Sequence, residues 1–320
     1  MATLMPNPNP FIPPTAGQVQ AHLARHPARL PSRWPAMLPM VLLATVVVMI
    51  LAMTSQSHTL SMLSMLGVAV LLCLSFMFAG RARRAQALER QVSAAQELAA
   101  VRRYPEALRL AWRLLPAAAG TPELHWRTIA CMGQVLDQLG AHEAALSAYE
   151  YLTQRFSAEE PIGVHLRLQR AVLLLILDRM IDADQALRSL RGPVEEAGDP
   201  VIRASYRLAC LQQQVRTNHF DDVLAAAPSL LDDLRPLGVE AGFGHALMAL
   251  SFYKSLGAAA ASPEAIAPAP AQAGLWWSRA TLLLPLTELV RRYAALAELA
   301  QDPQLAAATG HALPQAPGGT

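Results

Sequence analysis

Few residues in this sequence have the types and spacing that chemistry requires. His22 and His26 are four residues apart, a spacing at which two helical histidines can face one metal ion. No third ligand lies nearby, and Pro27 follows at once. The stretch Gly242–His245 (GFGH) is a glycine pair entering a helix, which alone is a weak sign of a phosphate site. The sequence therefore predicts no metal and no cofactor.

The carboxylates and cysteines form no catalytic set either. Asp221 and Asp222 stand together at an expected helix start, where the helix dipole favours negative charge. The chain has no P-loop, no Rossmann glycine pattern, no G-x-S-x-G and no H-E-x-x-H. Its three cysteines form no C-x-x-C motif, which fits a reducing compartment. We therefore expect a protein that is not an enzyme.

The most distinctive feature is an uncharged stretch near the N-terminus. No Asp, Glu, Lys or Arg lies between Arg33 and Arg81, and two apolar runs, 34–53 and 60–80, fill this gap. Each is about 20 residues long, the length a helix needs to cross a hydrocarbon core. A buried pair of core helices is the alternative. The sequence predicts a two-helix transmembrane hairpin over 34–80.

The flanking charges predict how this hairpin is oriented. Arginines precede the first span and follow the second, whereas the linker 54–59 has neither Arg nor Lys. The positive-inside rule then places both termini in the cytoplasm, as in an integral protein of a bacterial inner membrane. A cleaved signal peptide is the alternative for the first span, and it would leave the rest of the chain cytoplasmic.

The N-terminal segment 1–33 is rich in proline and has no acidic residue. We expect residues 1–15 of this cytoplasmic tail to be disordered, and 17–30 to form at most a short basic turn at the membrane surface. The first acidic residue is Glu89, and beyond Arg84 acidic residues outnumber basic ones. The downstream part is therefore mildly acidic, which argues against binding to nucleic acid.

The downstream part contains an internal repeat. Four stretches each join a turn to an amphipathic helix, and their equivalent residues Ala107, Ala145, Ala183 and Val223 recur at intervals of 38, 38 and 40 residues. Another helix precedes each stretch, so the repeated unit is a helix–turn–helix. The sequence predicts an all-α fold with four to five such units over 86–257. A fifth first-type helix is expected over 239–256.

The second unit resembles a tetratricopeptide repeat. Small, large and aromatic residues occupy the family's expected places, namely Gly133, Leu136, Gly140, Ala145 and Tyr149, and the first unit matches at Tyr104, Glu106 and Ala107. Units three and four match less well, with Asp178 and Thr217 near the turn in place of glycine. The resemblance implies an alpha-solenoid, and an irregular solenoid of another type remains an alternative.

The resemblance also implies where a partner binds. First helices of such repeats line a groove that holds a peptide or helix of another protein. The matching polar positions are Arg127, Gln134, Asp137 and Gln138 in unit two, followed by Gln212, Arg216 and Lys254. Unit three has apolar residues there, Leu168, Val172 and Leu175.

The C-terminal part is expected to close the domain. A flexible loop is predicted over 258–274, a capping helix over 275–300 that Pro285 kinks or splits, and a disordered tail over 301–320. Trp276 and Trp277 cannot share one helix face, so either they pack in the core or one stays exposed as an anchor for a partner or a membrane.

These features favour one function and leave two alternatives. The favoured function is a membrane-tethered scaffold whose cytoplasmic groove holds another protein. The first alternative is a structural membrane component that associates with copies of itself through unit three and the tryptophan pair. The second is an enzyme or sensor whose site has no recognisable motif.

Overall fold

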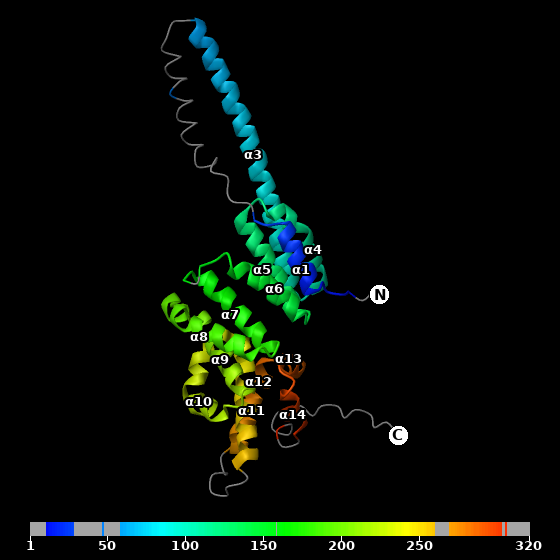
Figure 1. The fold of residues 1–320 in the computed structure, drawn as a ribbon, viewed down its shortest axis with the longest axis vertical. Helices are drawn as coiled ribbons and strands as arrows, with labels where there is room; N and C mark the ends of the chain where they lie inside the picture. The colour runs from blue at the N-terminus through cyan, green and yellow to red at the C-terminus, as the bar shows by residue number, and fades with distance from the viewer. Residues whose placement is uncertain are drawn as a thin grey trace. The chain divides into compact units, whose positions relative to one another are not determined.

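The computed structural model describes residues 11–28, 47, 58–157, 159–259, 269–302 and 305 (Figure 1). Every regular element in these ranges is a helix, so the all-α prediction is confirmed. The chain divides into two compact units, Met1–Leu152 and Thr153–Thr320.

The first predicted span lies almost wholly outside the described residues, and the second is described mainly in its backbone. Of the first span, 34–53, only Val47 is described. The backbone of the second span, 60–80, is helical throughout, although few of its side chains are described. Within the described part of the chain, no helix is both long enough and apolar enough to cross a membrane.

The first unit is built around one long helix. It contains α1 (Ala16–Arg25), α3 (His58–Ala100), α4 (Tyr104–Ala118), α5 (Pro122–Gln138) and α6 (His142–Thr153). The C-terminal part of α3 packs against α4 and α5, and α4 packs against α5. Figure 1 shows the other end of α3 projecting beyond the helices of this unit. The helix therefore continues without a break from the predicted second span into the packed unit.

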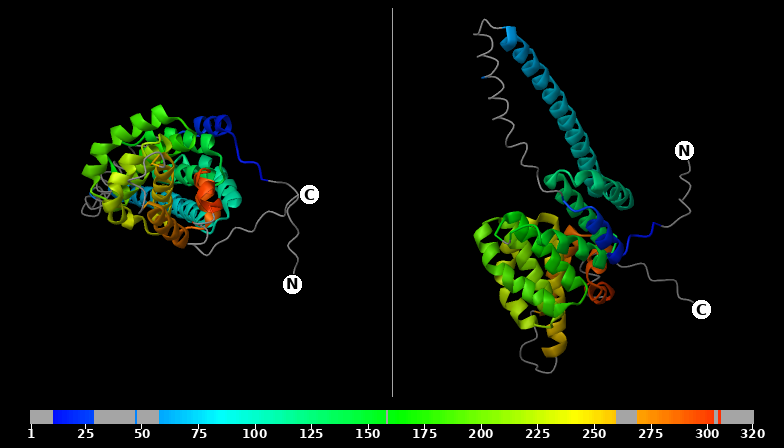
Figure 2. Two further views of the ribbon diagram at one scale, coloured as in Figure 1. Left: turned by 90° about the horizontal axis from the view of Figure 1, so that it is seen from below. Right: turned by 45° about the horizontal axis from the view of Figure 1, so that its top comes forward.

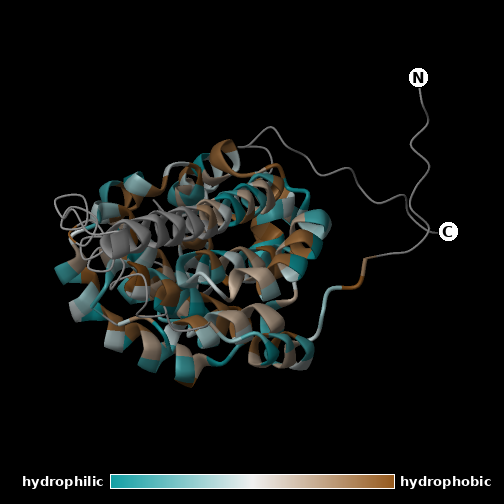
Figure 3. Cartoon of the chain, turned by 90° about the horizontal axis from the view of Figure 1, so that it is seen from above, coloured by the Kyte–Doolittle hydropathy of each residue, from teal (hydrophilic) through white to brown (hydrophobic). Residues whose placement is uncertain are grey.

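The second unit is a series of helices joined by short turns. It contains α7 (Pro161–Ile176), α8 (Met180–Ala197), α9 (Pro200–Arg216), α10 (Phe220–Leu234), the 3₁₀ helix η1 (Arg235–Glu240), α11 (Ala241–Ala259), α12 (Ala269–Leu283), α13 (Leu286–Arg292) and α14 (Leu296–Gln301). Each of the helices α7 to α11 packs against the next, and α11 packs against α12. Alternate helices also meet, α7 with α9 and α9 with α11. The views of Figure 2 show these helices side by side, and Figure 3 shows hydrophobic and hydrophilic segments alternating along the helices.

The same turn ends α3, α5, α7 and α9. In each case one residue adopts a left-handed backbone, namely Arg102 (φ 62°), Gly140 (φ 75°), Asp178 (φ 56°) and Asn218 (φ 61°). Its N–H donates to the carbonyl three residues earlier, and the next N–H donates to the carbonyl five residues earlier. This pair of bonds satisfies carbonyls that a helix end leaves open. The turn thus recurs at the intervals of the sequence repeat.

Only one of these four turns has the glycine that a left-handed backbone favours. Asparagine and aspartate tolerate this conformation because their short polar side chains can bond locally, which explains Asp178 and Asn218. The residue at the fourth turn is thus Asn218, one position after the expected Thr217. At Arg102 the strain amounts to about 1–2 kcal/mol, which the packing around the turn must offset.

Gly133 allows α5 and α6 to approach closely. A Cβ added at Gly133 would lie 3.0 Å from Cε2 of Tyr149, and that tyrosine is buried. The small and aromatic positions of the second sequence repeat, Gly133 and Tyr149, are therefore in contact. Burial raises the pKa of the Tyr149 hydroxyl, so the group stays neutral.

Both ends of the chain differ from expectation. Residues 16–25 form the helix α1 instead of a disordered tail and a surface turn. The predicted loop 258–274 is shorter, because α11 extends to Ala259 and α12 begins at Ala269. The predicted capping helix is split at Pro285, as expected, and is interrupted again between Arg292 and Leu296. The predicted tail 301–320 lies mostly outside the described residues.

Candidate partner-binding surfaces

In the first unit, the predicted groove residues form an accessible polar stripe. Arg127, Gln134 and Gln138 are seven and four residues apart on α5, a spacing that places them on one helix face. Gln134 is exposed. Arg127 donates to Gln96 Oε1 of α3 at 2.9 Å and lies 3.9 Å from Glu89. Side chains of α3 and α5 thus make one continuous polar surface.

Asp137 and Gln138 tie α5 to neighbouring helices. Asp137 Oδ1 lies 3.0 Å from Nδ1 of His142, the first residue of α6. The Tyr104 hydroxyl at the start of α4 donates to Gln138 Oε1 at 3.5 Å. These two residues therefore support the stripe at the turn end of the unit, whereas Gln134 is its exposed centre.

In the second unit, two of the three predicted groove residues are largely buried, and the third is paired with the C-terminal segment. Gln212 is buried, and the Arg216 side chain is only 9% exposed. Arg216 pairs with Asp178, and its guanidinium lies 4.8 Å from the ring centre of Tyr293. Lys254 pairs with Glu298 of α14. These three residues therefore do not form an open groove.

The C-terminal segment packs on the same unit. Leu289, Leu296 and Leu299 of α13 and α14 are fully buried in the cluster that contains side chains of α9, α10 and α11. These apolar side chains need a surface to pack on, and α11, which packs against α14, supplies part of it. The third sequence repeat also differs from expectation. Leu168 and Leu175, which the resemblance places along the groove, are core residues.

The two adjacent tryptophans are both buried, with exposures of 4% for Trp276 and 2% for Trp277. Of the two alternatives that the sequence left open, packing in the core is the one observed. Helix α12 is embedded on more than one side, and the His245 ring lies 5.3 Å from that of Trp276. Both tryptophans therefore pack in the apolar cluster of the second unit.

The GFGH stretch is a packing feature. A Cβ added at Gly244 would lie 2.2 Å from Leu234 of α10, and one added at Gly242 would lie 2.9 Å from Leu283 of α12. The glycines let α11 approach both neighbours. His245 is 7% exposed, its Nδ1 has no hydrogen-bond partner among the described residues, and burial together with Arg279 lowers its pKa.

Sequence reasoning missed the docking of α1 onto the first unit. Val19 and Leu23 of α1 are buried. The His22 ring stacks on Trp112 of α4, with ring centres 4.0 Å apart and planes 6° apart. A signal was present in the sequence: Thr15 and Gln18 form a capping box, and the apolar residues behind it are four apart.

The His22 contact is explained by a proline. Residue 116 of α4 is Pro116, which has no N–H to donate to the carbonyl of Trp112 four residues earlier. His22 Nε2 donates to that carbonyl at 3.1 Å. This bond engages one of the two ring nitrogens of His22, and the described residues contain no group of three metal-ligating side chains. Burial lowers the pKa of His22, and the nearby His26 and Arg25 lower it further.

Two further bonds fix α1. His125 of α5, which is buried, donates from Nε2 to the His26 carbonyl at 2.9 Å. Gln20 donates to the Ser147 hydroxyl of α6 at 3.2 Å. The segment before the predicted hairpin therefore contacts three helices that follow it. Comparison with known protein families, with curated proteins and with solved structures finds no match for this chain.

Proposed function

We propose that this protein is a membrane-tethered scaffold whose α3–α5 face, in a tetratricopeptide-like solenoid, binds a segment of another protein. The observation that carries this proposal is the continuous polar surface of Gln96, Arg127 and Gln134, which lies on the first-type helices α3 and α5 and is accessible at Gln134. Polar side chains on a helical face of this kind supply directional contacts for a peptide or helix.

The contact of α1 with the first unit supports an even number of membrane crossings. Helix α1 precedes the uncharged stretch 34–80, and α4 to α6 follow it. A segment before the stretch can pack on helices after it only if both flanks lie on one side of the bilayer. Two spans satisfy this condition, and the flanking arginines place that side in the cytoplasm.

The same contact argues against a cleaved first span. Cleavage after residue 53 would separate α1 from the unit that buries its Val19 and Leu23. Helix α3 is continuous through 60–80 to Ala100, so the second span would hold the unit at the membrane through a rigid helix.

Photocrosslinking in native membranes tests the scaffold. A photoreactive residue replaces Gln134, and the control replaces Arg188 of α8, whose side chain is 79% exposed. We expect one dominant foreign protein to be captured from position 134, and Arg127→Ala to reduce the capture. Capture of the same proteins from both positions, or of none, would refute the assignment of the groove.

Self-association is a second candidate, and a specific observation favours it. Leu275, Leu282 and Leu283 of α12 are 44%, 84% and 36% exposed. Leu282 and Leu283 lie about two helical turns beyond Leu275. Light scattering of the full chain in detergent, compared with Leu282→Gln, tests it. A particle of one chain at all concentrations would exclude this function.

A further inference from the structure

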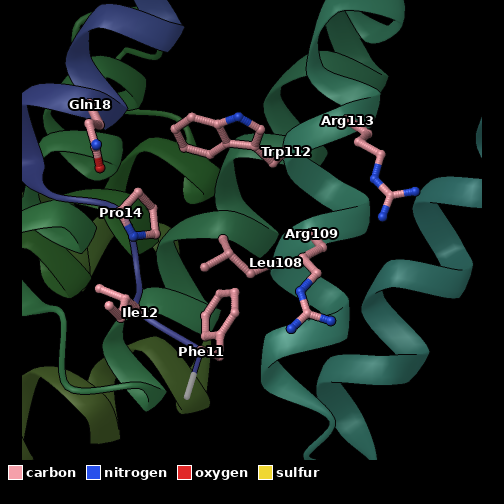
Figure 4. Close-up of a pocket in the computed structure, with 8 residues that line it drawn as sticks. All are labelled: Phe11, Ile12, Pro14, Gln18, Leu108, Arg109, Trp112 and Arg113. Carbon is pink, nitrogen blue, oxygen red and sulfur yellow. The ribbon is translucent and has the colours of Figure 1, made fainter. Parts of the chain in front are cut away.

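A hollow of about 300 Å³ lies where the chain before α1 crosses α4 (Figure 4). Its wall is contributed by two segments far apart in sequence and combines apolar with polar side chains: Phe11, Ile12, Pro14, Gln18, Leu108, Arg109, Trp112 and Arg113. The volume is at the lower end of the range for ligand sites in proteins. The hollow exists only while the N-terminal segment is docked.

Two guanidinium groups that line the hollow lack a carboxylate partner. Arg109 and Arg113 are exposed, one helical turn apart on α4, and within the described ranges neither forms an ion pair. By contrast, Arg103, Arg179 and Arg188 each pair with a carboxylate three or four residues away. Two like charges at this spacing repel each other slightly, which an anionic ligand would relieve.

The apolar part of the hollow is also incompletely covered. Ile12 is 81% exposed, and Figure 4 shows it beside Phe11 and Leu108. The Arg109 guanidinium lies 5.1 Å from the ring centre of Phe11, which holds this positive charge next to the apolar surface. A ligand that fits therefore combines negative charge with a large apolar group.

We propose that this hollow binds an acidic peptide segment that carries a large apolar side chain. The site is separate from the α3–α5 face, because it is formed by the N-terminal segment and α4. The apolar side chain enters between Ile12, Leu108 and Trp112, and carboxylates on either side of it meet Arg109 and Arg113. Carboxylate–guanidinium pairs of this kind add specificity to the apolar contact.

A peptide fits better than a lipid headgroup because of the position of α4. Helix α3 continues from Gly80 to Ala100, about 30 Å at 1.5 Å per residue, before α4 returns along it. Arg109 and Arg113 thus lie roughly 15–25 Å beyond the end of the proposed span, whereas the headgroup layer is only about 5–8 Å thick. This step alone depends on the proposed topology.

Fluorescence anisotropy with the full chain in zwitterionic detergent tests the proposal. The probe is a labelled peptide, Asp-Glu-Leu-Phe-Glu-Asp, and two control peptides replace either its acidic residues by Asn and Gln or its Leu-Phe by Ser-Ser. We expect saturable binding of the probe and at least tenfold weaker binding of each control peptide. Higher salt should weaken the binding of the probe, because salt screens exposed charges.

Protein variants locate the site. The double variant Arg109→Gln/Arg113→Gln should bind the probe at least tenfold more weakly, and Arg188→Gln in α8, also exposed, should bind it like the wild type. Because the changed side chains are exposed, the thermal midpoint should not change. Loss of binding only in variants that also unfold earlier, or equal binding by all variants, would overturn the proposal. Binding to vesicles of anionic phospholipid that depends on the same arginines, without peptide binding, would assign the site to lipid instead.

Discussion

Replacement of His22 by alanine should release α1 from the first unit. The change removes the stacking on Trp112, worth about 0.5–1.5 kcal/mol, and the bond to the Trp112 carbonyl, which leaves that group unpaired at a further cost of about 1–3 kcal/mol. His22 is only partly buried, so water can replace part of the lost bond. We therefore expect a loss of about 1–2 kcal/mol, which is a 5- to 30-fold shift toward undocked α1.

The variant Pro116→Ala makes this prediction sharper. Alanine restores an N–H that can donate to the Trp112 carbonyl, so the carbonyl no longer depends on His22. In this background, His22→Ala should cost about 1 kcal/mol less than in the wild type. The difference between the two costs isolates the bond to the carbonyl from the stacking of the rings.

Hydrogen exchange of the α1 amides in the full chain, reconstituted in nanodiscs, measures the docking. Exchange should accelerate in His22→Ala and stay unchanged in Ala21→Ser, an exposed position of the same helix. If exchange of α1 does not respond to His22→Ala, then the carbonyl freed by Pro116 is not what holds the helix. The same conclusion follows if His22→Ala has an equal effect in the wild type and in Pro116→Ala.

Four further predictions concern pH, turns, packing and topology. Burial and nearby positive groups lower the pKa of His22 below 6.5, so the docking of α1 should be fully present above about pH 6.5 and weaken as the pH falls below it. His22→Ala should remove this pH dependence in the same hydrogen-exchange experiment. Gly140→Ala should lower the free energy of unfolding by about 1 kcal/mol in denaturant titrations because its φ is 75°, whereas Gly120→Ala should not lower it. Gly163→Ala should destabilise the chain by more than about 2 kcal/mol in the same titrations, because its Cβ would lie 1.7 Å from the Ser157 carbonyl oxygen. Gly192→Ala serves as the control, because a Cβ at Gly192 would have no atom within 4 Å. Ser57→Cys in the linker between the two predicted spans should react with an impermeant maleimide from outside intact cells, in a background without the native cysteines; labelling only after lysis would contradict the hairpin.

Much of the fold could be predicted because local patterns determine it. Helical periodicity placed the first-type and second-type helices, and the spacing of Ala107, Ala145 and Ala183 located the turns. Glycine marked one turn only, because Asp178 and Asn218 also tolerate a left-handed backbone, and nothing in the local sequence marks Arg102 as such a residue. The recurrence is visible in the sequence, but the conformation at each turn depends on the helices it joins.

The sequence by itself determined the helical class, the uncharged stretch near the N-terminus and the repeat, since each follows from the order of apolar, polar and turn residues along the chain. Only the tertiary structure decided which polar residues remain accessible. Arg216 is largely buried and Lys254 is paired with Glu298 of α14, whereas Gln134 stays open. The same holds for α1, whose docking site depends on a carbonyl that Pro116 leaves free on a distant helix. Such contacts join residues about a hundred positions apart, and because no local pattern records them, only the packing of the helices reveals them.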